Sequence, residues 1–157
     1  MKVTLLVVGK TDKTWVKESI AEYSKRLKHY VSFNIEVIPD IKKPKSLTIE
    51  QQKIEEGKLI LSKDYSAKEV HLFDEKGKMF TSKEFAQFIE KKMVGGLKDL
   101  VFVIGGPYGF SQDVYEKANS KISLSRLTFS YQMARLLCIE QIYRAFTILK
   151  GEPYHHD

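Results

Sequence analysis

The apolar run Leu100-Val101-Phe102-Val103-Ile104, together with the Gly105-Gly106-Pro107 that follows it, constrains the fold more than any other stretch. Five consecutive apolar residues ended by a turn sequence predict a short strand buried on both faces. Such strands belong to parallel sheets, in which ligands bind just beyond the carboxyl ends of the strands. Glycines there allow positive φ angles and let another molecule approach the main chain, although they also suit a sharp turn without a ligand.

Strand-like and helix-like segments alternate along the rest of the chain, without repeats, low-complexity segments or linkers. Apolar runs and alternating patterns predict strands at residues 3–8, 33–38, 70–73, 100–104 and 127–129. Helical spacing predicts helices from Asp12 to Leu27, from Ser82 to the Gly95-Gly96 pair, and at residues 50–61, 111–118 and 133–149. We expect Asp12 and Ser82 to cap two of these helices, and residues 74–77 to form a turn. The sequence therefore predicts a single α/β domain over residues 1–157, with a mainly parallel sheet and helices on both faces.

Composition narrows the class of protein. The single cysteine, Cys138, excludes an intrachain disulfide and fits a reducing cytoplasm. No apolar stretch approaches the ~20 residues of a membrane span, and residues 3–8 lack the cleavage site of a signal peptide. The net charge of +6 favours an anionic partner, nucleic acid above all.

The expected final helix, residues 133–149, is apolar in nearly every direction. A helix packed against one sheet needs an apolar stripe on one side only. We therefore expect a second copy of the chain to cover part of it, giving a homodimer. The alternative is a helix at the centre of its own core.

Common catalytic and phosphate-binding motifs are missing from the sequence. It has no G-x-x-x-x-G-K-[ST] loop, no G-x-G-x-x-G fingerprint, no Cys/His spacing for zinc and no Ser/His/Asp arrangement. We expect no metal site, because His155-His156 beside Asp157 is typical of a solvated tail. Two polar groups stand out, at residues 123–128 and 151–156, and both also suit solvent-facing loops.

Four segments support a family resemblance: Val8-Gly9-Lys10 and residues 103–109, 122–129 and 140–155. On these segments the chain resembles the RlmH family, small members of the SPOUT (α/β-knot) superfamily of RNA methyltransferases. The resemblance implies a trefoil knot in the C-terminal part, a homodimer and S-adenosyl-L-methionine as the methyl donor. It also implies that the substrate is N3 of a pseudouridine in helix 69 of bacterial 23S rRNA, in the large subunit or the assembled ribosome.

The resemblance implies a cofactor site at three loops that follow neighbouring strands. Its expected cofactor-binding residues are Phe73, Gly105, Leu124, Ser125, Arg126, Leu127, Thr128 and Phe129. The apolar members of this set suit walls for an adenine ring. A sulfonium is already a good leaving group, so the protein's task is to orient donor and acceptor, which can supply ~7–11 kcal/mol.

Tyr154, His155 and Arg135 are the candidates for handling the N3 proton and the charge on the uracil carbonyls. Structural roles are open as well, because Arg135 and Arg144 can pair with Glu140 along the helix and Tyr154 can simply pack. Lysines are the candidates for RNA phosphate contacts, namely Lys10, Lys42, Lys43 and Lys45.

The chain departs from the family's pattern just before the final helix. Ser130-Tyr131 stands where Pro-His is expected before Gln132. Any role of that histidine must therefore fall to Tyr131 or lie elsewhere.

Two rival classes of function remain, a non-catalytic ribosome- or nucleotide-binding module and an enzyme that uses another cofactor, such as a flavin. Binding of S-adenosylmethionine separates both from a methyltransferase.

Overall fold

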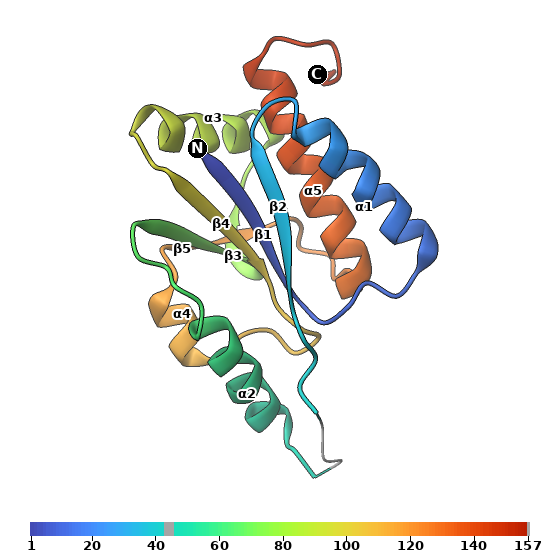
Figure 1. The fold of residues 1–157 in the computed structure, drawn as a ribbon, viewed down its shortest axis with the longest axis vertical. Helices are drawn as coiled ribbons and strands as arrows, with labels where there is room; N and C mark the ends of the chain where they lie inside the picture. The colour runs from blue at the N-terminus through green and yellow to red at the C-terminus, as the bar shows by residue number, and fades with distance from the viewer. Residues whose placement is uncertain (43–45, 157) are drawn as a thin grey trace.

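A computed structural model describes residues 1–42 and 46–156, which form one sheet and the helices around it (Figure 1). Lys43 and Lys45 of the expected basic loop lie outside the described residues, as does Asp157. The elements in chain order are β1 (Lys2–Val8), α1 (Thr14–Leu27), β2 (Ser32–Ile38), α2 (Ile49–Leu61), β3 (Lys68–Met79), α3 (Ser82–Val94), β4 (Asp99–Ile104), α4 (Gln112–Lys117), β5 (Ser120–Ser123) and α5 (Tyr131–Leu149).

The strands of the sheet run in the order β2-β1-β4-β3-β5, and every paired neighbour is parallel. The predicted parallel α/β architecture is therefore confirmed. In the register of the sheet, Phe73 pairs with Ile104 on one side and with Ile122 on the other. This pairing brings the segments that follow β3, β4 and β5 to the same edge of the sheet.

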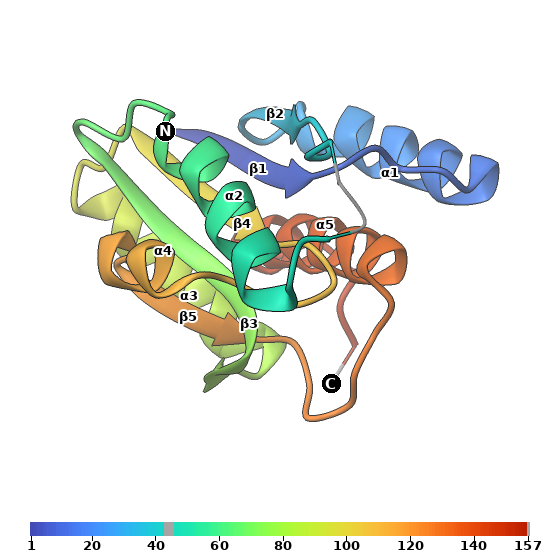
Figure 2. The same ribbon diagram turned by 90° about the horizontal axis from the view of Figure 1, so that it is seen from below.

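Helices cover both faces of the sheet, as predicted. Helices α1, α3 and α5 lie on one face, and α2 and α4 on the other (Figures 1 and 2). The side chains of β4 alternate between the two cores: Phe102 and Ile104 pack in the first, Val101 and Val103 in the second. Because each fully buried large apolar side chain contributes about 1.5–3 kcal/mol, β4 anchors both layers.

Helix α5 packs between α1 and α3 on its face of the sheet (Figure 1). Cys138, Ile139 and Ile142 are fully buried within the chain. The alternative of a helix at the centre of its own core thus explains much of its apolar character, while Leu136 and Leu137 stay partly exposed. The homodimer and the knot remain predictions. In the part of the chain that the structure describes, no helix is long and apolar enough to cross a membrane.

The predicted strand at residues 127–129 is wrong. The fifth strand lies earlier, at Ser120–Ser123, and residues 127–129 form an irregular loop. Strand β5 lies at the edge of the sheet, and of its residues Ser120–Ser123 only Ile122 and Ser123 are buried. A short and polar sequence is therefore sufficient for it. The predicted turn at residues 74–77 is wrong as well, since β3 continues to Met79 through an irregularity after Phe73.

Both predicted helix caps are wrong by one residue. Lys13, without a capping side chain, precedes α1 instead of Asp12. Thr81 caps α3: its hydroxyl accepts a hydrogen bond from the backbone N–H of Glu84, and its own backbone N–H donates to the carboxylate of Glu84. The T-x-x-E spacing of this capping box is visible in the sequence and is a stronger signal than Ser82.

Candidate functional site

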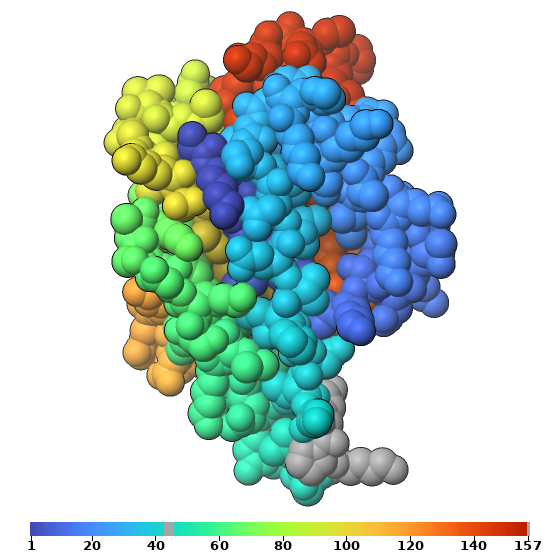
Figure 3. All heavy atoms as spheres, viewed as in Figure 1, coloured from blue at the N-terminus to red at the C-terminus, as the bar shows by residue number. Residues whose placement is uncertain are grey.

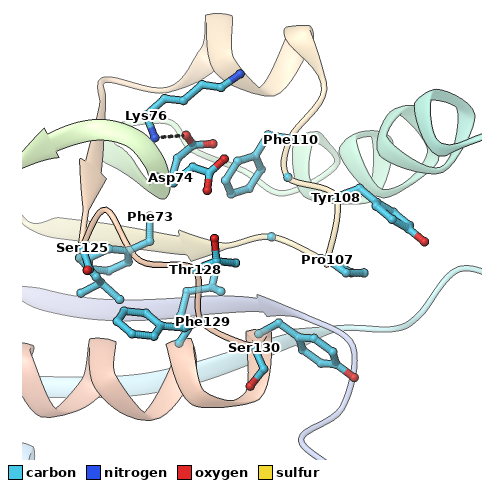
Figure 4. A pocket seen from close by; sticks show the side chains of 18 of the residues that line it. Phe73, Asp74, Lys76, Pro107, Tyr108, Phe110, Ser125, Thr128, Phe129 and Ser130 are labelled. Atoms are coloured by element: carbon cyan, nitrogen blue, oxygen red, sulfur yellow. Dashed lines mark hydrogen bonds between the residues drawn. The ribbon is translucent and has the colours of Figure 1, made fainter.

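A cavity of about 600 Å³ opens between the irregular part of β3 that follows Phe73 and the carboxyl ends of β4 and β5 (Figure 4). Its volume lies within the range of about 300–1,000 Å³ that is typical of small-molecule sites. The lining residues are Lys53, Phe73, Asp74, Glu75, Lys76, Ile104, Gly105, Gly106, Pro107, Tyr108, Gly109, Phe110, Tyr115, Leu124, Ser125, Leu127, Thr128, Phe129, Ser130, Tyr131 and Ala134. The cavity is thus formed by β3 around Phe73, by the segments that follow β4 and β5, by the start of α5, and by side chains from α2 and α4.

The structure brings most of the predicted cofactor residues to this one cavity. The residues that line it are Phe73, Gly105, Leu124, Ser125, Leu127, Thr128 and Phe129. Arg126 lies in the same loop, but it is exposed and is not among the lining residues.

Hydrogen bonds within the loop after β5 fix its shape. The hydroxyl of Ser123 donates to the carbonyl of Ser125, 2.9 Å away, and the backbone N–H of Leu127 donates to the hydroxyl of Ser125, also at 2.9 Å. The side chain of Leu127 nevertheless remains 73% exposed, and Phe129 is 36% exposed. Exposed apolar side chains beside a cavity are typical of a ligand-binding surface.

The glycine turn after β4 has a different physical basis from the one expected. Neither Gly105 nor Gly106 has a positive φ angle; in this turn only Gly109 does, at +84°. A Cβ atom on Gly105 would lie 3.0 Å from the ring of Phe110, and one on Gly106 would lie 2.7 Å from the carboxylate of Glu56. A side chain at either position would therefore have to displace Phe110 or Glu56.

One carboxylate of the lining is held rigidly. Oδ1 of Asp74 accepts a hydrogen bond from the backbone N–H of Lys76 at 2.8 Å, and Oδ2 accepts one from the hydroxyl of Tyr115 (Figure 4 labels Asp74 and Lys76). Burial and the bond to Asp74 raise the pKa of Tyr115, so this phenol remains a hydrogen-bond donor. Sequence reasoning missed Asp74; its position directly after Phe73, at a predicted strand end, was the available signal.

Tyr154 and His155 lie away from this cavity. The hydroxyl of Tyr154 donates to Glu140 at 3.0 Å, and its ring packs edge-on against Tyr143 at 4.8 Å between centroids. Nη1 of Arg144 lies 3.2 Å from Nδ1 of His155. Since the cavity includes Ala134 on the first turn of α5, about 9 Å of helix separates it from Glu140 and about 15 Å from Arg144. Figures 1 and 3 show the C-terminal tail and α2 at opposite ends of the molecule.

Arg135 is buried and holds the loop between β1 and α1. Its guanidinium donates to the carbonyl of Val8 and, at 3.0 Å, to the hydroxyl of Thr11. It also lies 5.3 Å from the ring centre of Tyr131, which lines the cavity, whereas Arg135 itself does not. The expected pairing of Arg144 with Glu140 is confirmed, at 2.7 Å, but Arg135 makes no such pair within the described residues.

The remaining predictions concern anions and metals. Lys10 and Lys42 are exposed, as an RNA-contacting residue must be. Across residues 1–42 and 46–156, the structure contains no group of three or more His, Cys, Asp or Glu side chains placed to hold a metal ion. Tyr131, the residue at the departure from the family's pattern, lines the cavity.

Comparisons with known proteins identify the family of the chain. The sequence profile of a family described as "Predicted SPOUT methyltransferase" matches residues 1–155. The chain is 57% identical over 156 residues to "Ribosomal RNA large subunit methyltransferase H" of Christiangramia forsetii, covering 99% of both chains. It is also 57% identical over 157 residues to the protein of the same name from Parabacteroides distasonis, covering 100% of both.

A solved structure shows the same fold. A probable methylase family protein from Haemophilus influenzae Rd KW20 superposes with a TM-score of 0.52 and 13% sequence identity, covering 99% of this chain and 70% of that one. The parallel sheet, the cavity at its edge and the match along nearly the whole sequence lead to one assignment. The chain belongs to the SPOUT methyltransferase family.

Proposed function

We propose that this protein uses S-adenosylmethionine to methylate N3 of a pseudouridine in helix 69 of bacterial 23S rRNA. The observation that supports this most strongly is the cavity formed by Phe73, Gly105 and the loop at residues 124–130. The names of its close relatives, which describe methyltransferases of large-subunit ribosomal RNA, support the choice of substrate. An enzyme of this kind works in the cytoplasm.

The residues of the cavity fit the proposed methyl donor. Phe73, Leu124 and Leu127 offer apolar surface to an adenine ring, and the irregular loop around them leaves backbone groups to hydrogen-bond its edge. The fixed carboxylate of Asp74 suits a ligand with positive charge. When bound, the donor supplies a methyl group on a sulfonium, which is a good leaving group.

The chain's own work is to orient the two reactants and to stabilise charge. Holding the ring nitrogen in line with the methyl carbon can supply about 7–11 kcal/mol. As N3 loses its proton, negative charge develops on the neighbouring uracil carbonyls, where a hydrogen-bond donor is favourable.

The imidazole of His155 is the candidate for this donor. Arg144 holds the ring, because an arginine only donates and its Nη1 lies 3.2 Å from Nδ1 of His155. We assign His155 to the uracil carbonyl and Tyr154 to holding the tail. Burial and the hydrogen bonds to Tyr23 and Glu140 raise the pKa of Tyr154, which disfavours it as a base.

Tyr154 and His155 of the tail do not line the cavity of their own subunit. Tyr154 and His155 contact the second half of α5, whereas the cavity lies at the first turn of that helix. We therefore infer a homodimer in which the tail of one subunit reaches the cavity of the other.

Two further features belong to the proposal. One is the C-terminal trefoil knot expected for the family, and the other is contact of Lys10 and Lys42 with phosphates of the RNA.

Methyl transfer from isotopically labelled S-adenosylmethionine tests the proposal. The acceptors are unmethylated ribosomes, and ribosomes in which the target position is uridine instead of pseudouridine. We expect label in 23S rRNA of the first set and much less in the second. Binding of the donor without transfer to any 23S rRNA, by folded and dimeric protein, would instead favour a non-catalytic ribosome-binding module.

A further inference from the structure

Asp74 is a rigid negative charge inside the cavity. Both of its carboxylate oxygens are held, one by the backbone N–H of Lys76 and the other by the hydroxyl of Tyr115. Figure 4 shows its side chain on the β3 side of the cavity, with Thr128 and Phe129 on the loop that leads to α5. Its position is therefore set before any ligand binds, which removes the entropic cost of ordering a flexible side chain.

The other charged residues of the cavity are held differently. Glu75 and Lys76 are exposed to solvent. Lys53 lies 3.4 Å from Glu50 in an ion pair on α2. Asp74 is the partly buried acidic side chain of the lining, so a cation inside the cavity interacts with it with the least screening by water.

We propose that the negative charge of Asp74 makes the cavity bind the positively charged sulfonium donor more tightly than its neutral thioether product. The inference rests on the proposed function, because it requires S-adenosylmethionine in this cavity. The donor has a net charge of +1, from a sulfonium, an ammonium and a carboxylate. S-adenosylhomocysteine, formed when the methyl group and the positive charge of sulfur are lost, is neutral overall.

The size of the cavity limits how far a bound sulfonium can lie from Asp74. A cavity of about 600 Å³ is about 10 Å across, so a sulfonium inside it lies within the range over which charges at a protein surface interact. Loss of the sulfonium charge weakens the attraction to Asp74 and favours release of the product. Asp74 thus determines which form of the cofactor binds more tightly, a role that the family resemblance did not imply.

Isothermal titration calorimetry with the two cofactor forms tests this inference. We expect Asp74→Asn to weaken binding of S-adenosylmethionine about tenfold or more, and binding of S-adenosylhomocysteine less than threefold, because the substitution removes a charge and keeps the shape. Tyr115→Phe, which frees the carboxylate, should shift the ratio in the same direction by less. Asp113→Asn is the matched control: it removes the same charge from an exposed position on α4, outside the cavity.

The outcomes separate the inference from the proposed function. Equal weakening for both cofactor forms, or no weakening of either, would overturn the role of Asp74 while leaving the methyltransferase intact. Failure of the wild-type protein to bind either form would overturn the proposed function itself. Thermal unfolding of each variant shows whether a loss of affinity reflects a loss of folded protein.

Discussion

A Cβ atom on Gly77 would lie 2.5 Å from the backbone nitrogen of Ile122. The two strands β3 and β5 can therefore pack together here only because residue 77 has no side chain. This contact fixes the edge strand whose continuation forms the loop at residues 124–130. Gly77, directly after the cavity-lining Lys76, thus supports the opposite wall of the cavity at residues 124–130.

Gly77→Ala should destabilise the protein. Since the obstructing atoms belong to the backbone, the clash cannot be relieved by a side-chain rotation, and we expect a loss of about 1–3 kcal/mol or more in the free energy of unfolding. Urea denaturation measures this loss. Lys78→Ala, an exposed change one residue away, is the control, and equal stability of the two variants would refute the packing argument.

The stability of the protein should fall between pH 7 and pH 5 because of His71. This imidazole is buried against Ser120 and Glu69, and burial lowers its pKa below the ordinary 6.5. The unfolded chain therefore binds a proton at a pH where the folded chain does not. The stability that depends on a neutral, buried His71 is fully present above pH 6.5 and is lost as the pH falls through the lowered pKa of His71.

Unfolding experiments at several pH values test the role of His71. The groups that face it are Glu69, Lys92, which binds Glu69 at 2.6 Å, and the hydroxyl of Ser120. Of these groups, only the histidine titrates near neutral pH. We expect His71→Gln to flatten the decline in stability between pH 7 and pH 5. The exposed change His29→Gln should leave it unaltered, and an unchanged slope in His71→Gln would contradict the assignment.

Arg135→Met should mainly cost stability. The substitution removes the hydrogen bonds to Val8 and Thr11, and a hydrogen bond that involves a charged group contributes about 1.5–3 kcal/mol. We expect kcat per folded molecule to change less than tenfold. A fall of a hundredfold or more with unaltered stability would show that Arg135 acts in the reaction. Arg26→Met, at an exposed position on α1, controls for the loss of an arginine.

Mixed dimers should reveal whether the tail acts across the subunit interface. Thr128→Trp blocks the cavity and His155→Ala alters the tail, so each variant alone should be inactive. In a heterodimer of the two, one wild-type cavity meets one wild-type tail, and random mixing should restore about a quarter of the wild-type activity. If the tail served its own subunit's cavity, mixing would restore none.

Several parts of this fold could be predicted because local signals and burial agree. The apolar runs at residues 3–8 and 100–104 are central strands covered on both faces, so hydrophobicity alone identifies them. Strand β5 has no such signal. Its pairing depends on the contact between Gly77 and Ile122, which local sequence does not express.

The site was predictable in its segments and less so in its chemistry. The three cavity-forming segments follow from strand ends together with the family resemblance. Asp74 was missed because β3 was expected to end at residue 73, which made Asp74 a turn residue. A positive φ angle at Gly105 and Gly106 was expected wrongly; the packing of Phe110 and of Glu56 from α2 against them was missed, while approach of a ligand to their main chain stays a prediction.

Calorimetric titration of S-adenosylmethionine into wild-type protein and into Thr128→Trp tests the central claim most directly. Thr128 is exposed, so the tryptophan should fill the cavity without altering stability. We predict one donor bound per wild-type chain and no measurable binding to a variant that unfolds at the same temperature. Equally tight binding by the folded variant, or none by the wild type, would contradict the claim that this cavity holds the methyl donor.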